Sequence, residues 1–229
     1  MLSINDNLKF IHEEIASTAE FCGRKSEDIL LVAVSKFREI KDINTALEAG
    51  HEVFGENYVQ ELKDKIDYFA NKPQKPVWHY IGHLQTNKVK YIVDKIEMLQ
   101  TIDSVNLATE VSKFLKKSDC KLEVLIQVNT SGEMSKSGCD PDAAIELVNN
   151  VLKLPNLYVN GLMTIGSFSN NERVYRKEFI LLRKLFDDIN SQLGLKMKHL
   201  SMGMTNDFQA AIEEGSTIVR IGTAIFGER

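Results

Sequence analysis

A lysine at the end of an apolar segment is the first candidate for chemistry in this chain. Residues 29–36 read ILLVAVSK, an apolar run that ends on Ser35 and Lys36. Such a run is typical of a strand buried on both faces of a parallel sheet, and in α/β barrels the carboxyl ends of strands form the site. An amine held there against apolar walls loses hydration, so its pKa falls and it can form a Schiff base with an aldehyde. An ordinary lysine that leaves a strand into solvent is the alternative, and the octapeptide alone favours it.

Two segments near the carboxyl terminus have the composition of anion-binding loops. Ser201, Gly203 and Met204 follow one short apolar segment, with a helix expected after Thr205, and Gly222-Thr223 follow the next. Barrel enzymes commonly bind phosphate after strands seven and eight, and glycine lets the backbone approach an anion closely. Ordinary turns are the alternative, but two such loops in the expected places favour a phosphate site.

Arg220 lies inside the apolar segment 217–221 and therefore needs an acceptor. Its partner could be a structural carboxylate or a ligand nitrogen beside the phosphate. Together, Lys36, Arg220 and the two loops match the aldehyde, ring nitrogen and phosphate of pyridoxal 5′-phosphate (PLP). An arginine does not deliver a proton to the ring nitrogen, so we expect limited chemistry on a bound amino acid.

The elements that must position these residues alternate between short apolar segments and amphipathic ones. Ser3 and Asp6 form a capping box before a first helix, and Asp140-Pro141 begin a later one. We expect strands at 29–36, 53–55, 77–81, 96–100, 122–128, 157–164, 199–202 and 217–221, with helices at 39–49, 58–69, 88–93, 172–193 and 207–214 among those between them. This pattern predicts one (β/α)8 TIM barrel with an extra N-terminal helix. A doubly wound open sheet would instead need a glycine-rich turn after strand one.

Composition argues against several classes of protein. The net charge is −4, from 28 basic and 32 acidic residues, which disfavours a general nucleic-acid binder. Cys22, Cys120 and Cys139 are widely spaced and predict neither a disulfide framework nor a metal site. The first 25 residues lack a signal-peptide pattern, and no apolar run is long enough to span a bilayer. We therefore expect a cytoplasmic location and no membrane partner.

Seven motifs in order make the whole chain resemble the YggS/PROSC family of pyridoxal phosphate-binding proteins, the PLP homeostasis proteins. They are AVSKF, FGENYVQEL, WHYIGHLQTNK, VNTSGEMSKSG, GLMTIG, LSMGMTNDF and VRIGTAIFG. Tyr80 and Thr205 stand where phenylalanine and serine are frequent in that family. The segment 130–133 differs more, which puts roles for that loop in doubt.

The resemblance implies a barrel similar to the N-terminal domain of alanine racemase, a fold-type III PLP enzyme. It implies a Schiff base on Lys36 and an Arg220 that faces the pyridine nitrogen. It implies Ser201, Gly222 and Thr223 at the phosphate, and Asn57 and His83 near the ring. Gly203 and Met204 are further expected cofactor-binding residues. The family is associated with PLP homeostasis and the balance of amino and keto acids, and no robust catalytic activity is ascribed to it.

A carrier is the expected role, because an alanine racemase takes its second base, a tyrosine, from an additional domain. We expect residues 1–229 to form one PLP-binding domain, a monomer whose partners are PLP and possibly apo PLP-dependent enzymes. One alternative is an amino-acid racemase with His83 or Tyr58 as the opposing acid. A cofactor-free barrel enzyme for a sugar or nucleotide phosphate is more remote. Lys136 could relay the aldehyde, but a solvated loop lysine is the simpler interpretation.

Overall fold

A computed structural model describes residues 3–167, 169 and 171–228 as alternating strands and helices. The strands are β1 (Leu30–Val34), β2 (Val53–Glu56), β3 (Val77–Tyr80), β4 (Met98–Ile102), β5 (Leu122–Gln127), β6 (Leu157–Met163), β7 (His199–Ser201) and β8 (Ile218–Ile221). The helices are α1 (Ile4–Phe21), α2 (Ile40–Glu48), α3 (Val59–Phe69), α4 (Val105–Ser118), α5 (Ala144–Val151), α6 (Glu172–Leu193), α7 (Phe208–Glu213) and α8 (Thr223–Phe226). Short 3₁₀ helices span Ser26–Asp28, Thr86–Tyr91 and Pro141–Ala143.

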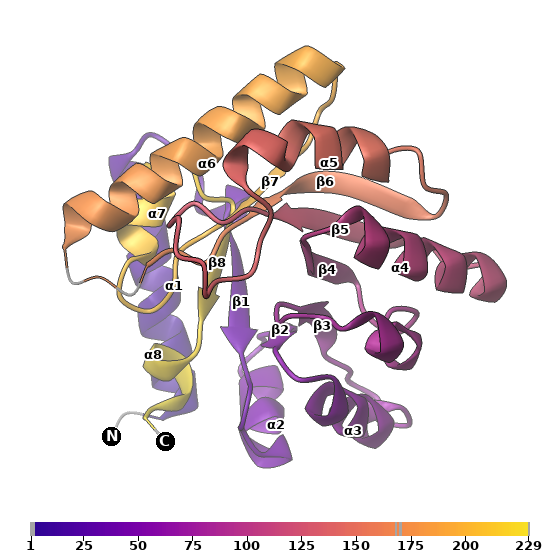
Figure 1. The fold of residues 1–229 in the computed structure, drawn as a ribbon. Helices are drawn as coiled ribbons and strands as arrows, with labels where there is room; N and C mark the ends of the chain where they lie inside the picture. The colour runs from indigo at the N-terminus through magenta and orange to yellow at the C-terminus, as the bar shows by residue number, and fades with distance from the viewer. Residues whose placement is uncertain (1–2, 168, 170, 229) are drawn as a thin grey trace.

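All eight strands are parallel and close into one barrel in sequence order. The closure is between β1 and β8, where Ala33 lies opposite Ile221. Figure 1 shows the helices outside this sheet. The predicted (β/α)8 barrel with an extra N-terminal helix is therefore confirmed, and the open sheet is excluded.

The strands bury side chains on both faces, because the barrel interior and the helix layer each form a core. The interior cluster contains Val32, Met98, Leu125, Met163 and Ile218. A larger cluster fills the space between the strands and the surrounding helices. Alternate residues of a strand point to the same face, so Val34 lies in the same inward row as Leu30 and Val32, and Lys36 follows in the turn after β1.

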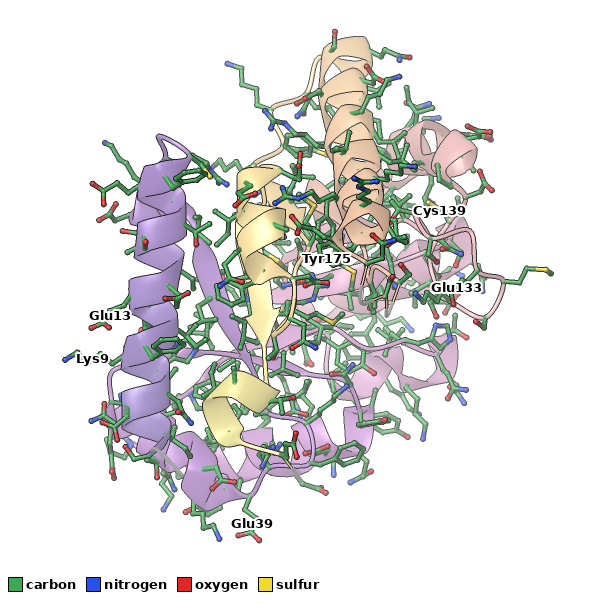
Figure 2. The ribbon with its side chains drawn as sticks, turned by 90° about the vertical axis from the view of Figure 1, so that its left-hand side faces the viewer. Lys9, Glu13, Glu39, Glu133, Cys139 and Tyr175 are labelled. Carbon is green, nitrogen blue, oxygen red and sulfur yellow. The ribbon has the colours of Figure 1, made fainter. Side chains whose placement is uncertain are left out.

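The N-terminal helix α1 begins at the predicted capping box, in which Ser3 and Asp6 exchange hydrogen bonds. Its buried face packs against α7 and α8, while Figure 2 shows Lys9 and Glu13 pointing away from the barrel. The Asn7 side chain donates a hydrogen bond to the carbonyl of Ile225 in α8, at 2.9 Å. The first helix is therefore tied to the last one. Among the described residues, we find no helix with the length and hydropathy that a bilayer crossing requires.

Three expected elements differ from the structure. The segment predicted as a helix at 88–93 is a 3₁₀ helix at Thr86–Tyr91, and the fourth strand, expected at 96–100, runs two residues later, from Met98 to Ile102. It continues through Gln100 and Thr101 because these polar side chains find buried partners, His79 Nδ1 at 3.0 Å and the Gly82 carbonyl at 2.8 Å. Gly222 precedes the short helix α8, where we expected a loop.

Candidate cofactor site

Lys36 lies at the mouth of the barrel, just after β1, as the sequence predicts. Its side chain is half-buried and, with Val34, lines a cavity of about 380 Å³. A second cavity of about 370 Å³ shares Val34, Lys36, Gly222 and Thr223. Volumes of this size are typical of small-molecule sites.

Five of the predicted residues surround the 380 Å³ cavity: Lys36, Met204, Arg220, Gly222 and Thr223. They come from the loops after β1 and β7 and from β8 with the start of α8. Sequence reasoning did not assign the remaining lining residues, which are Ser167, Ser169, Tyr175, Thr205, Asn206 and Asp207. For Thr205 a signal existed, because it occupies the predicted anion loop and carries a hydroxyl.

Arg220 supplies a buried cation at the inner wall of this cavity. Its Nη1 donates to Ser201 Oγ at 2.6 Å and its Nη2 to the Thr164 carbonyl at 2.8 Å. Burial lowers the pKa of the guanidinium to about 10, while nearby Asp207 opposes the shift. The group therefore stays charged at neutral pH.

Ser201 is not among the residues that line the cavity, where a phosphate would bind. Its hydroxyl is fully buried, accepts from Arg220 and donates to Gln100 Oε1 at 2.6 Å. Gln100 in turn bonds His79 Nδ1, and burial lowers the pKa of this histidine to about 4, so it is neutral. The hydrogen bonds from Ser201 through Gln100 to His79 hold the Arg220 side chain in place from inside the barrel. A phosphate role for Ser201 stays a prediction.

The two anion loops are built on close backbone packing. Gly203 has a φ of 95°, and a Cβ there would lie 2.6 Å from the Ala211 side chain, so a larger residue does not fit. Gly203 therefore shapes the loop, while Met204 lines the cavity. A Cβ at Gly222 would lie 3.2 Å from the Val34 carbonyl. Within α8, the first backbone N–H groups have no intrahelical acceptor, so they are available to an anion.

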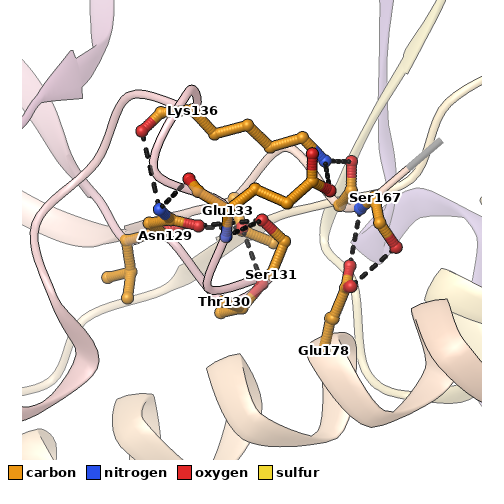
Figure 3. Close-up of polar contacts among 10 residues, drawn as sticks. Asn129, Thr130, Ser131, Glu133, Lys136, Ser167 and Glu178 are labelled. Carbon is orange, nitrogen blue, oxygen red and sulfur yellow. Dashed lines mark hydrogen bonds and ion pairs between the residues drawn. The ribbon is translucent and has the colours of Figure 1, made fainter.

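Buried carboxylates of this region are already occupied by backbone donors. Asp207 Oδ1 accepts from the Met204 N–H at 2.5 Å, and burial raises the pKa of this carboxyl. Glu178 accepts from both the N–H and the hydroxyl of Ser167, each at 2.7 Å (Figure 3). These contacts fix the loops that surround the cavity.

Asn57 and His83 line two other cavities, of about 580 and 150 Å³, and Lys36 lines neither of them. The His83 side chain is 59% exposed, and its Nδ1 lies 3.6 Å from Asp103 Oδ2. Asn57 Oδ1 is buried and has no hydrogen-bond partner among the described residues. Asn57 follows β2, the strand next to β1, and His83 follows β3, so both lie at the same end of the barrel as Lys36, and their contact with a ring stays a prediction.

Lys136 is not the solvated loop lysine that its surroundings suggest. Its side chain is only 14% exposed, pairs with Glu133 at 2.8 Å and donates to the Gly166 carbonyl at 3.0 Å (Figure 3). It lines the 150 Å³ cavity with Asn57 and His83. The loop therefore folds over the barrel mouth.

The donor set of the Lys36 cavity fits PLP. An amine, a buried guanidinium and glycine-flanked amides match its aldehyde, ring nitrogen and phosphate. The one carboxylate in the lining, Asp207, bonds the Met204 amide.

Comparison with known proteins gives the family. The model of the alanine racemase N-terminal domain matches residues 13–229. The pyridoxal phosphate homeostasis protein of Vibrio cholerae is 45% identical over 231 residues, covering 100% of this chain and 98% of that protein. The chain belongs to this family. The Aquifex aeolicus homeostasis protein is 42% identical, with coverage of 98% and 97%.

The solved structures agree with this assignment. PipY of Synechococcus elongatus PCC7942, solved with PLP bound, superposes with a TM-score of 0.82 at 29% identity. The superposition covers 93% of this chain and all of PipY. The alanine racemase of Clostridium difficile 630, at 16% identity and a TM-score of 0.76, shares the fold. This chain covers 60% of that racemase.

Proposed function

We propose that this chain binds PLP in the Lys36 cavity and serves PLP homeostasis as a carrier, with residues 1–229 as one binding domain. The observation that supports this proposal most directly is that one cavity is lined by Lys36, Arg220, Gly222 and Thr223. Its support from relatives is the name of the homologous proteins and the PLP in the PipY structure.

Each residue has a distinct task in this proposal. PLP, when bound, supplies an aldehyde that condenses with an amine to a Schiff base and releases one water. Lys36 provides that amine at the half-exposed mouth of the barrel. Arg220 donates hydrogen bonds toward the ring nitrogen and keeps its own proton, because its pKa lies well above neutral. Thr223 and the Gly222 loop hold the phosphate through backbone N–H groups.

Titration of the apo-protein with PLP tests this proposal. We expect a visible absorption band that borohydride removes, and a reduced adduct that peptide mass mapping places on Lys36. The absence of a band, or an adduct elsewhere, would contradict the proposal. The absence of any PLP binding would also favour a cofactor-free barrel enzyme for a phosphorylated substrate.

Delivery to apo-enzymes is the finer part of the proposal. The position of Lys36 at the barrel mouth, where its side chain is only partly buried, is the observation that favours transfer to an incoming amine. Loaded protein mixed with an apo PLP-dependent enzyme should restore activity faster than the same enzyme incubated with the concentration of free PLP that the loaded protein releases. Equal rates would show release into solvent without direct transfer.

A racemase should exchange the α-proton of its amino acid, and we expect this chain not to. The proposed opposing acids, His83 and Tyr58, are 59% and 49% exposed and line a different cavity from Lys36. Loaded protein is incubated with each proteinogenic amino acid in deuterated water, and α-deuterium is measured by mass spectrometry. Incorporation at enzyme-like rates that is lost in His83→Ala would establish the racemase instead.

The variant Ser201→Ala separates two roles of that hydroxyl. Because Ser201 supports Arg220 from below, we expect its loss to weaken PLP and pyridoxal, which lacks the phosphate, by the same factor. The loss of the buried contacts to Arg220 and Gln100 should also lower the free energy of unfolding by roughly 1–3 kcal/mol. A loss confined to PLP would instead make Ser201 a phosphate ligand.

A further inference from the structure

The turn that contains Lys36 has an unfavourable backbone conformation. The Arg38 N–H donates to the Ser35 carbonyl at 3.0 Å, which closes a β-turn with Lys36 and Phe37 at its centre. Phe37 has a φ of 61°. Turns with a positive φ at this third position take glycine or asparagine there, because other side chains are strained. Something outside the turn must therefore hold it.

Two side chains of α3 bind the backbone on either side of Lys36. The Phe37 N–H donates to Glu61 Oε1 at 2.6 Å. Lys65 Nζ donates to the Ser35 carbonyl at 2.8 Å and to Glu61 Oε1 at 2.7 Å. Both residues adjacent to Lys36 in the chain are thus anchored to the same helix.

The Lys65 part of this anchor is buried, whereas the Glu61 side chain is 21% exposed. The Lys65 side chain is 6% exposed, and its ammonium also pairs with the fully buried Glu56 at 2.6 Å. The same Glu56 oxygen accepts from the Ser35 hydroxyl at 2.6 Å. Electrostatic contacts are stronger and less screened in such a site than at a surface.

We propose that Glu61 and Lys65 are positioning residues for the Lys36 amine. They impose the left-handed conformation on Phe37 and so direct the Lys36 side chain into the 380 Å³ cavity. The inference rests on the proposed attachment of PLP to Lys36. A merely structural ion-pair cluster would stabilise the fold without affecting the attachment of PLP.

Variants of Glu61 test the hold on the turn. Glu61→Ala removes the acceptor of the Phe37 N–H, and we expect about a tenfold weaker PLP affinity. This factor corresponds to the conformational cost of one non-glycine residue in the left-handed region, which Glu61 would no longer offset. Glu61→Gln keeps an oxygen acceptor and should remain within about threefold of the original protein. Asp64→Ala, which removes an exposed carboxylate from the same helix, is the matched control and should change nothing.

Substitutions of Phe37 separate positioning from general stability. In the Glu61→Ala background, Phe37→Gly should restore PLP affinity, because glycine adopts a φ of 61° without strain. Phe37→Ala loses the same ring but keeps the strain, so it should not restore affinity. Equal effects of glycine and alanine, or a Glu61→Ala affinity equal to that of the original protein, would overturn the inference.

Two further readouts keep the outcomes distinct. Hydrogen exchange of the Phe37 amide in the apo-protein should accelerate in Glu61→Ala, and unchanged exchange would contradict the anchor independently of PLP. If Glu61→Ala does not fold, Phe37→Val against Phe37→Gly tests the same turn, with weaker PLP binding expected for valine and equal binding overturning the inference. Failure of the original protein to form an adduct at Lys36 refutes the proposed function instead.

Discussion

Lys36→Ala is expected to abolish the covalent attachment of PLP. The remaining contacts, from Arg220 and the Gly222-Thr223 segment, can still hold the phosphate and the ring, so weak binding should persist. We expect the affinity to fall by about a hundredfold or more, which corresponds to ~2.7 kcal/mol. Absorption after PLP addition and the mass of the borohydride-reduced protein measure the two effects.

The control for this experiment is Lys41→Ala, which removes a nearby exposed lysine. It should form the reduced adduct in full. An adduct that persists in Lys36→Ala and maps to Lys136 would show that the cavity with Asn57 and His83 is the attachment site.

Lys65→Met is expected to give a large loss of stability. Methionine has a similar length but no charge, so Glu56 would remain buried beside an apolar side chain, and burial already raises the pKa of this carboxyl. Removal of one partner from a buried ion pair costs about 3–5 kcal/mol. Urea denaturation of the apo-protein measures the change.

Lys63→Met is the matched control, because it lies on the same helix but is half-exposed, 3.6 Å from Asp67. Exposed pairs contribute about 0–1 kcal/mol, so little change is expected. A Lys65→Met variant as stable as this control would mean that water or a rearranged Glu56 compensates for the lost ammonium.

The barrel could be predicted because each strand is a short apolar run with a clear boundary. Ile29 to Val34 has no helical period, and Lys36 follows this apolar run at its carboxyl end. The long helix Glu172–Leu193 was predicted with about these bounds, because its apolar positions recur over six turns. The fourth strand was predicted two residues too early, because buried polar residues such as Gln100 have partners that lie far away in sequence.

The hydrogen bonds of Glu61 and Lys65 to the backbone beside Lys36 were not predicted. Lys65 was read as part of an ordinary amphipathic helix, yet its position three residues after Leu62 and four before Phe69 places it on the buried face. That spacing was the available signal.

The contact between Asn7 and Ile225 has a practical consequence. It joins the first helix to the short helix α8, which begins at Thr223. Changes at the amino terminus are therefore transmitted toward the backbone that we propose binds the phosphate. Affinity tags or truncations that disturb residues 3–21 should therefore alter cofactor retention, although these residues lie far along the chain from Gly222 and Thr223.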